Sequence, residues 1–175
     1  GGLTHAIGTG GRDLSSKVGG ITARMGLDLL NRDPDTRVIV LISKPPDKDA
    51  ADDIVNYARG LSKPVIINFI GYSTPLDWIE NLHFQTTFDD TARSAVLLAN
   101  QPPEEKTEDD FHLDRFKPSQ RYLRGLFSGG TLAYEALLIL SHYLPGVYSN
   151  VPLKEEFRLE NSLVSLEHTI IDLGE

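Results

Sequence analysis

The run TRVIVLIS, residues 36–43, contains five consecutive apolar residues. A strand with one buried face alternates apolar and polar residues, whereas a continuous apolar run is typical of a parallel strand that is buried on both faces. A second run of this kind, KPVIINFIG, occupies residues 63–71. Together the two runs predict the centre of a parallel β-sheet.

Helix-like and strand-like segments alternate around these two runs. Further strand-like segments are residues 3–8 and 82–86, and helix-like segments are residues 17–31, 47–61 and 88–100. The first helix places Ile21, Met25, Leu29 and Leu30 on one apolar face. The other two helices carry acidic residues near their starts, where the helix dipole favours negative charge. The alternation predicts a doubly wound α/β domain over residues 1–100.

A change in composition follows this domain. Residues 101–117, QPPEEKTEDDFHLDRFK, are rich in proline and charge and are interpreted as a linker. Residues 118–175 then begin a second, similar domain, with a glycine turn that opens a long apolar helix and with a strand-like HTIIDLG near the end. The chain starts in one strand-like run and stops after another, so we expect both ends to cut through a longer protein.

Composition excludes several classes of function. The net charge of −8 and the lack of a basic, aromatic stripe argue against nucleic acid as a partner. The chain has no cysteine, which rules out disulfide scaffolds and thiolate chemistry, and the spacing of its histidines suggests no metal site. No apolar run approaches the roughly 20 residues of a membrane span, and no secretion signal is evident. We therefore expect a cytoplasmic protein without a membrane partner.

The stretch AIGTGGRDLS, residues 6–15, places a glycine turn between a predicted strand and a predicted helix. The first backbone N–H groups of a helix are unpaired and carry partial positive charge, and glycine lets a ligand approach them closely. The predicted phosphate or carboxylate site comprises Gly8, Thr9, Gly10, Gly11 and Ser15, with Arg12 as a charged donor. The alternative is a tight turn that contacts no ligand.

Lys44 follows the apolar run of residues 36–43 directly. Ligands of open parallel sheets bind outside the carboxyl ends of the strands, and the glycine turn is predicted to lie at the same edge. A lysine ammonium is a compact point charge that suits phosphate. Lys44 and Arg12 are therefore the candidate catalytic residues, and a solvated lysine ahead of a Pro-Pro turn is the alternative.

A second glycine turn, FSGGT, adds Ser128, Gly129, Gly130 and Thr131 to the candidate anion-binding residues. It precedes a helix as the first turn does, which we interpret as a weak internal repeat. His83 lies in the predicted strand of residues 82–86, where packing or a hydrogen bond is the simplest role for its side chain.

The stretches IGTGGRDLS, DPDTRVIVLISKPP and KPVIINFIG together resemble the second domain of the succinyl-CoA synthetase α subunit, and in particular the FdrA-like branch of that acyl-CoA synthetase superfamily. The later GLFSGGTLAYEALLIL resembles the glycine-led helix of the β subunit's C-terminal domain. The resemblance implies a flavodoxin-like CoA-ligase domain followed by the start of a second one. It also implies that both glycine turns hold a phosphoryl group.

Two departures from the superfamily's pattern concern its phosphohistidine. The Gly-His-Ala-Gly motif expected after the third strand is missing, and His83 matches the phosphocarrier position by count alone. Lys44 stands where the superfamily has a glutamate that holds the phosphohistidine. A lysine cannot accept the imidazole N–H, but it can hold an anion directly. These departures disfavour covalent phosphohistidine chemistry. Neither the CoA-binding Rossmann domain nor the ATP-grasp domain of relatives is recognisable in the chain.

The resemblance leaves three functions open. The FdrA-like branch is associated with carbamoyl transfer in purine or allantoin breakdown, in which oxalurate and phosphate give oxamate and carbamoyl phosphate, and such a step needs no protein nucleophile. An ATP-dependent acyl-CoA ligase with His83 as phosphocarrier is the second function, and a non-catalytic assembly domain is the third. The sequence does not identify a cofactor, and CoA, ATP and phosphate are the candidates. A small anionic substrate and other domains or subunits of the same enzyme are the expected partners.

Overall fold

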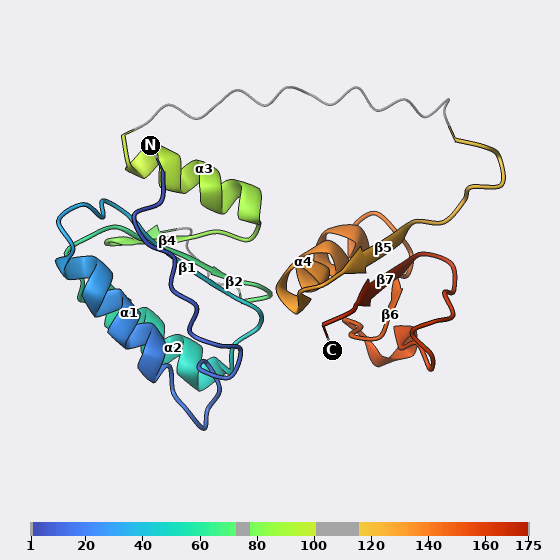
Figure 1. Ribbon diagram of the computed structural model, residues 1–175, viewed down its shortest axis with the longest axis horizontal. Helices are drawn as coiled ribbons and strands as arrows, with labels where there is room; N and C mark the ends of the chain where they lie inside the picture. Colours follow the sequence, from blue (N-terminus) through green and yellow to red (C-terminus); the bar gives the residue numbers. More distant parts are fainter. Residues whose placement is uncertain (1, 73–77, 101–115, 175) are drawn as a thin grey trace. The chain divides into compact units, whose positions relative to one another are not determined.

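The computed structural model describes residues 2–72, 78–100 and 116–174 (Figure 1). The chain divides into two compact units, Gly1–Pro103 and Glu104–Glu175, and each combines helices with a largely parallel sheet. Most of the predicted linker, residues 101–115, lies outside the described residues. The α/β class expected from the sequence is confirmed in both units.

The first unit has a four-stranded sheet in the order β1-β2-β4-β3. β1 (Ile39–Ser43), β2 (Val65–Phe69) and β4 (Leu82–Phe84) are parallel, and each lies inside a segment that the sequence predicted as a strand. β3 (Trp78–Ile79) pairs antiparallel with β4 and was not predicted, because a two-residue strand has no periodicity to detect. Every residue of β2 is buried, as its continuous apolar run requires.

Helices cover both faces of this sheet (Figure 1). α1 (Ile21–Arg32) and α2 (Lys48–Arg59) contribute Ala23, Leu27 and Ile54 to the core on one face. α3 (Phe88–Leu98) lies on the other face, where buried Asn68 of β2 donates a hydrogen bond to Thr91 over 2.8 Å. The three observed helices confirm the helix predictions for residues 17–31, 47–61 and 88–100, apart from their ends.

The predicted apolar face of the first helix is confirmed for Leu30 and wrong for its other three members. Ile21 and Met25 are 61% and 67% exposed, and Leu29 is exposed as well. Leu30 packs against the core as predicted, but its partners there are Ala23 and Leu27, which also follow helical spacing. Alanine is small enough for α1 to approach the sheet closely, and a count of large apolar residues overlooks that contribution.

The predicted strand of residues 3–8 does not form. This segment has no strand pairing, and Leu3 is 88% exposed. β1 bonds directly to β2, and the hydroxyl of Thr4 lies 3.0 Å from that of Thr36, just before β1. The segment therefore runs past the outer side of β1 without joining the sheet.

The second unit has a three-stranded sheet in the order β5-β7-β6, with β5 (Arg124–Phe127), β6 (Tyr148–Ser149) and β7 (Thr169–Asp172) all parallel. α4 (Gly130–Ser141) follows β5, and a short 3₁₀ helix, Glu155–Phe157, follows β6. β7 confirms the strand predicted at HTIIDLG, whereas β6 lies in VYSNVPL, where no strand was predicted. Ala133 and Leu137 of α4 pack with Val147 and Ile170 in a small core.

Candidate functional site

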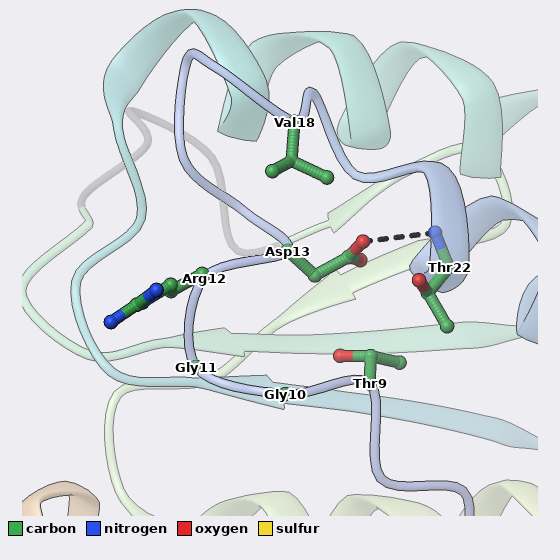
Figure 2. Close-up of a pocket in the computed structure, with 7 residues that line it drawn as sticks. All are labelled: Thr9, Gly10, Gly11, Arg12, Asp13, Val18 and Thr22. Atoms are coloured by element: carbon green, nitrogen blue, oxygen red, sulfur yellow. Dashed lines mark hydrogen bonds between the residues drawn. The ribbon is translucent and has the colours of Figure 1, made fainter.

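The first glycine turn lines an open surface hollow of about 460 Å³ (Figure 2). Its walls are formed by Thr9, Gly10, Gly11, Arg12, Asp13, Val18 and Thr22. Gly8 and Ser15 do not line the hollow. The structure therefore brings four of the predicted anion-site residues to one surface, those from Thr9 to Arg12.

Lys44 lies beside this turn. It follows Ser43, the last residue of β1, and a Cβ atom built on Gly11 would be 3.8 Å from the Cε atom of Lys44. Arg12 is exposed at the hollow, and in Figure 2 its side chain leaves the chain in the direction opposite to that of Asp13. Two cationic side chains thus flank the glycine turn at the carboxyl edge of the sheet, which is the arrangement the sequence predicted.

The start of α1 differs from the prediction. The helix begins at Ile21 rather than directly after the glycine turn, and the buried carboxylate of Asp13 occupies its first turn. Oδ1 and Oδ2 of Asp13 accept hydrogen bonds from the backbone N–H groups of Thr22 and Ala23, over 2.9 and 2.8 Å. An internal anion therefore takes the helix-terminal donors that we expected to bind a ligand.

The glycine turn keeps donors of its own. The N–H of Asp13 donates to the carbonyl of Gly10 over 3.1 Å, and Gly10 has a φ of +85°, which glycine adopts without strain. The backbone N–H groups of Gly10, Gly11 and Arg12 donate to no other residue within the part of the chain that the structure describes. These three groups are therefore the candidate backbone donors to an anion at the hollow.

The serines after the turn have structural roles. The carbonyl of Ser15 accepts hydrogen bonds from the N–H groups of Val18 and Gly19, over 3.1 and 2.8 Å. The N–H of Ser16 donates to Asp47 over 2.6 Å, and this bond holds the pKa of the Asp47 carboxyl below its usual range. Asp47 precedes α2, so residues 15–20 tie the starts of α1 and α2 together. The prediction that Ser15 belongs to the anion site is not supported, because Ser15 does not line the hollow.

Tyr72 follows β2 at the same edge of the sheet, and its phenol donates a hydrogen bond to Asp52 of α2 over 2.9 Å. Burial raises the pKa of Tyr72 to about 12, and the bond to the Asp52 carboxylate adds to the rise. Lys48 donates to the same carboxylate over 2.5 Å. These contacts hold the N-terminal half of α2 against the loop after β2.

The raised pKa of Tyr72 predicts a specific loss of stability in alkali. A group whose pKa is higher in the folded state stabilises that state fully below its unfolded pKa, here 10.0, and the contribution disappears as the pH rises toward 12. Urea unfolding at pH 9 and pH 11.5 should show a larger decline for the parent than for Tyr72→Phe. Equal declines in the two proteins would contradict the assignment.

His83 is not near the glycine turn. It pairs with Ile66 in the middle of the sheet, and its neighbours Leu82 and Phe84 face the core shared with α1 and α2. Side chains alternate along a strand, so His83 faces the opposite side, where burial lowers the pKa of its imidazole. By register His83 is level with Val40, and Lys44 lies four residues farther on, about 13 Å along the strand direction.

The second glycine turn has the predicted strand–turn–helix geometry. β5 ends at Phe127 and α4 begins at Gly130, with Gly129 in an extended conformation and no side chain capping the helix. The first turn of α4 contains no acidic residue, and a Cβ atom built on Gly129 would meet nothing within 4 Å. Unlike α1, α4 has no internal carboxylate bonded to its first turn among the described residues.

Two polar residues near the second turn were missed by sequence reasoning. The carboxylate of buried Asp172, the last residue of β7, accepts a hydrogen bond from the N–H of Gly174 over 2.9 Å. Asn150 brackets the backbone of Asp172, accepting from its N–H over 3.0 Å and donating to its carbonyl over 2.8 Å. A Cβ on Gly174 would lie 3.1 Å from the carbonyl oxygen of Ser128, which places Asp172 close to the turn.

Two further sequence predictions concern metals and membranes. Within residues 2–72, 78–100 and 116–174, no group of three or more histidine or acidic side chains is arranged to hold a metal ion. Over the same residues, no helix is both long enough and apolar enough to cross a bilayer.

The chain is similar to a protein of Escherichia coli K12 that is described as the uncharacterized protein YahF. The two are 38% identical over 186 residues, and the match covers all of this chain and 35% of the relative. The chain thus spans about a third of the length of the curated relative it matches. No family model matches the chain.

Proposed function

We propose that this chain is part of an FdrA-like enzyme of the acyl-CoA synthetase superfamily and binds a phosphoryl or carboxylate group at its glycine turns. The proposal includes a flavodoxin-like arrangement of the first unit, in keeping with its parallel strands and its helices on both sheet faces. The observation that carries the proposal is the position of Lys44, whose Cε lies 3.8 Å from a Cβ built on Gly11.

The chemistry of the hollow supports an anionic ligand. Arg12 at the hollow and Lys44 beside it supply positive charge, and the N–H groups of Gly10, Gly11 and Arg12 are available as donors. In the carbamoyl transfer that we favour, a phosphate oxygen attacks the ureido carbonyl carbon of oxalurate and forms a tetrahedral oxyanion. The oxyanion then collapses, the bond to nitrogen breaks, and the departing oxamate nitrogen takes up a proton. Fixed donors and cations stabilise such an oxyanion without a protein nucleophile.

The alternative functions have less support. A ligase with His83 as phosphocarrier requires the imidazole to reach the glycine turn, but His83 lies on the other face of the sheet and farther back along it. A non-catalytic assembly role is favoured by one observation, the exposed apolar side chains of Ile21, Met25 and Leu29 on α1. An assembly surface on α1 is compatible with an anion site at the hollow.

Titration calorimetry of the whole chain with phosphate, carbamoyl phosphate and oxamate at constant ionic strength tests the proposal. Lys44→Ala and Arg12→Ala should each weaken binding about tenfold, equivalent to about 1.4 kcal/mol, because each removes one charged donor from an exposed site. Arg93→Ala, which removes an exposed charge from α3, is the matched control and should leave the affinity unchanged.

Two results would overturn the site. The first is an affinity that falls equally in Arg93→Ala, which would indicate nonspecific attraction to net charge. The second is tight binding of all three anions by the Lys44→Ala and Arg12→Ala double variant. Binding of CoA or ATP alone, without any of the small anions, would favour the ligase function instead.

A further inference from the structure

Residues 4–11, here called the strap, have both ends beside the flanks of β1 and run in the same direction as β1, and Ile7 in the middle lies near Gly26 of α1. The strap starts at Thr4, whose hydroxyl is 3.0 Å from that of Thr36, and ends at Gly11, beside Lys44. The seven residue steps from Thr4 to Gly11 thus cover nearly the same distance as the eight steps from Thr36 to Lys44. A chain that covers this length is extended, as a strand is.

The outer edge of β1 is unpaired. β1 is the first strand in the sheet order, and its hydrogen bonds lead only to β2. The N–H of Ile39 donates to Pro64, and the carbonyl of Ser43 accepts from Ile70, so the odd-numbered residues of β1 face β2. Because backbone groups alternate along a strand, the N–H and C=O groups of Val40 and Ile42 face outward. No backbone bond joins them to the strap, although both segments are described.

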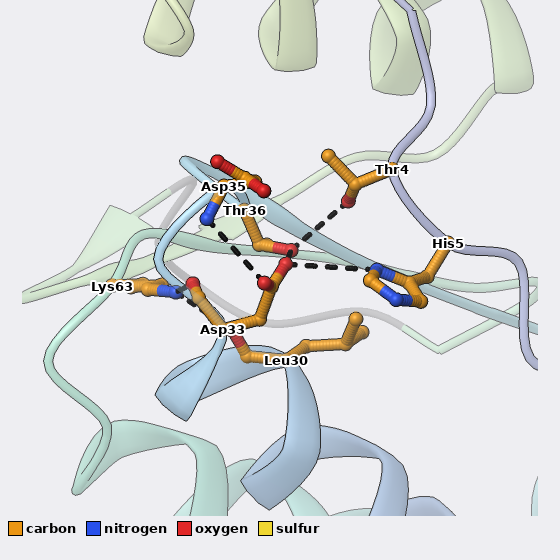
Figure 3. A network of polar contacts seen from close by, with 7 residues as sticks. All are labelled: Thr4, His5, Leu30, Asp33, Asp35, Thr36 and Lys63. Atoms are coloured by element: carbon orange, nitrogen blue, oxygen red, sulfur yellow. Dashed lines mark hydrogen bonds and ion pairs between the residues drawn. The ribbon is translucent and has the colours of Figure 1, made fainter.

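A polar network fixes the start of the strap (Figure 3). Asp33 follows α1, and its carboxylate accepts a hydrogen bond from the hydroxyl of Thr36 over 2.5 Å and lies 3.6 Å from Nδ1 of His5. Lys63 donates to the carbonyl groups of Leu30 and Asp33, which holds the end of α1 in place. The network sets Thr4 beside Thr36 and so defines one register for pairing between the strap and β1.

The other end of the strap carries like charges. Arg12 follows the strap, and Lys44 follows β1, so two cations flank the point where the segments meet. An anion that is bound between Arg12, Lys44 and the glycine N–H groups would connect the two segments.

We propose that the strap pairs in parallel with β1 when an anion binds at the hollow, and so becomes the edge strand of the sheet. This inference rests on the proposed anion site and adds a conformational response to it. Binding at Gly11 and Lys44 fixes one end of the strap, and the network at Thr4 and Thr36 already fixes the other. The intervening backbone groups then meet the outward groups of Val40 and Ile42 and extend the sheet by one strand.

Residue-resolved amide hydrogen exchange, with and without saturating phosphate, tests the inference. The amides of Val40 and Ile42 should exchange at least about tenfold more slowly in phosphate, because new hydrogen bonds protect them. The amides of Leu41 and Ser43 already face β2 and are the matched controls, so their exchange should change little. Calorimetric binding of phosphate without added protection at Val40 and Ile42 would overturn the strap proposal. Absence of binding would instead defeat the anion site on which it rests.

A pair of proline variants separates strand pairing from general ordering. Ala6→Pro and Ile7→Pro each remove one N–H, and adjacent residues of a strand direct these groups to opposite sides. Both positions are exposed, so both variants should fold, which circular dichroism can verify. The phosphate-dependent protection of Val40 and Ile42 should be lost in one variant and largely kept in the other. Full protection in both would show that the strap does not pair with β1.

Discussion

Replacing Gly20 by alanine should lower the free energy of unfolding of the first unit by about 3 kcal/mol, as the sum of a backbone cost and a packing cost. Gly20 precedes α1 with a φ of +72°, a conformation that side chains rarely adopt. A Cβ atom there would lie 2.7 Å from Cδ1 of Ile54 and 3.1 Å from Cδ2 of Leu14. Ile54 is fully buried, so it cannot move away without disturbing the core.

Gly19 provides the matched control for this substitution. It has nearly the same backbone conformation, with a φ of +69°, but a Cβ atom there would meet nothing within 4 Å. Gly19→Ala should therefore cost only the backbone term, about 1 kcal/mol. Urea unfolding followed by circular dichroism measures both variants. Equal losses would show that packing against Ile54 contributes nothing to the requirement for glycine.

Asp13→Ala should destabilise the first unit by about 2 kcal/mol, in the range for a lost helix cap with charged hydrogen bonds. Its carboxylate satisfies the N–H groups of Thr22 and Ala23, and Ala23 is buried, so water cannot replace the bond to that residue fully. For a unit of about 100 residues, this loss corresponds to a fall in melting temperature of about 10 °C.

Two comparisons identify the cause of that loss. Asp13→Asn keeps one acceptor oxygen and should show roughly half the effect, whereas Asp35→Ala removes an exposed carboxylate near the far end of α1 and should be nearly neutral. Sulfate should restore part of the stability of Asp13→Ala, because the vacated helix start can then bind an external anion. An Asp13→Ala variant as stable as the parent would contradict the capping role.

The sequence predicts the sheet of the first unit well, because the apolar runs of β1 and β2 are local signals of burial. It also places Lys44 at the edge of the sheet, since a residue that follows a parallel strand has few other locations. The role of Asp13 could not be predicted in this way. Asp13 lies eight residues before Ile21, and only the folded path of residues 14–20 returns it to the start of α1.

The other differences have similarly nonlocal causes. Residues 3–8 have a strand-like sequence. A strand forms only where its backbone groups bond to a neighbouring strand, and the local pattern of apolar residues does not show whether such a neighbour is present. The exposed side chains of Ile21 and Met25 satisfy the apolar pattern of a buried helix face, while small Ala23 makes the close contact. In the second unit the glycine turn opens a helix directly after a strand, so the local motif and the structure agree there.

The two cores differ in extent, and this difference determines which of the two units unfolds more easily. The first core joins two helices and three strands, whereas the second rests on one helix and a few residues around it, with Ala133, Leu137, Val147 and Ile170 at its centre. Fewer buried apolar contacts mean a smaller cost of opening. We therefore expect the second unit to open before the first, and to be cleaved before it in limited proteolysis.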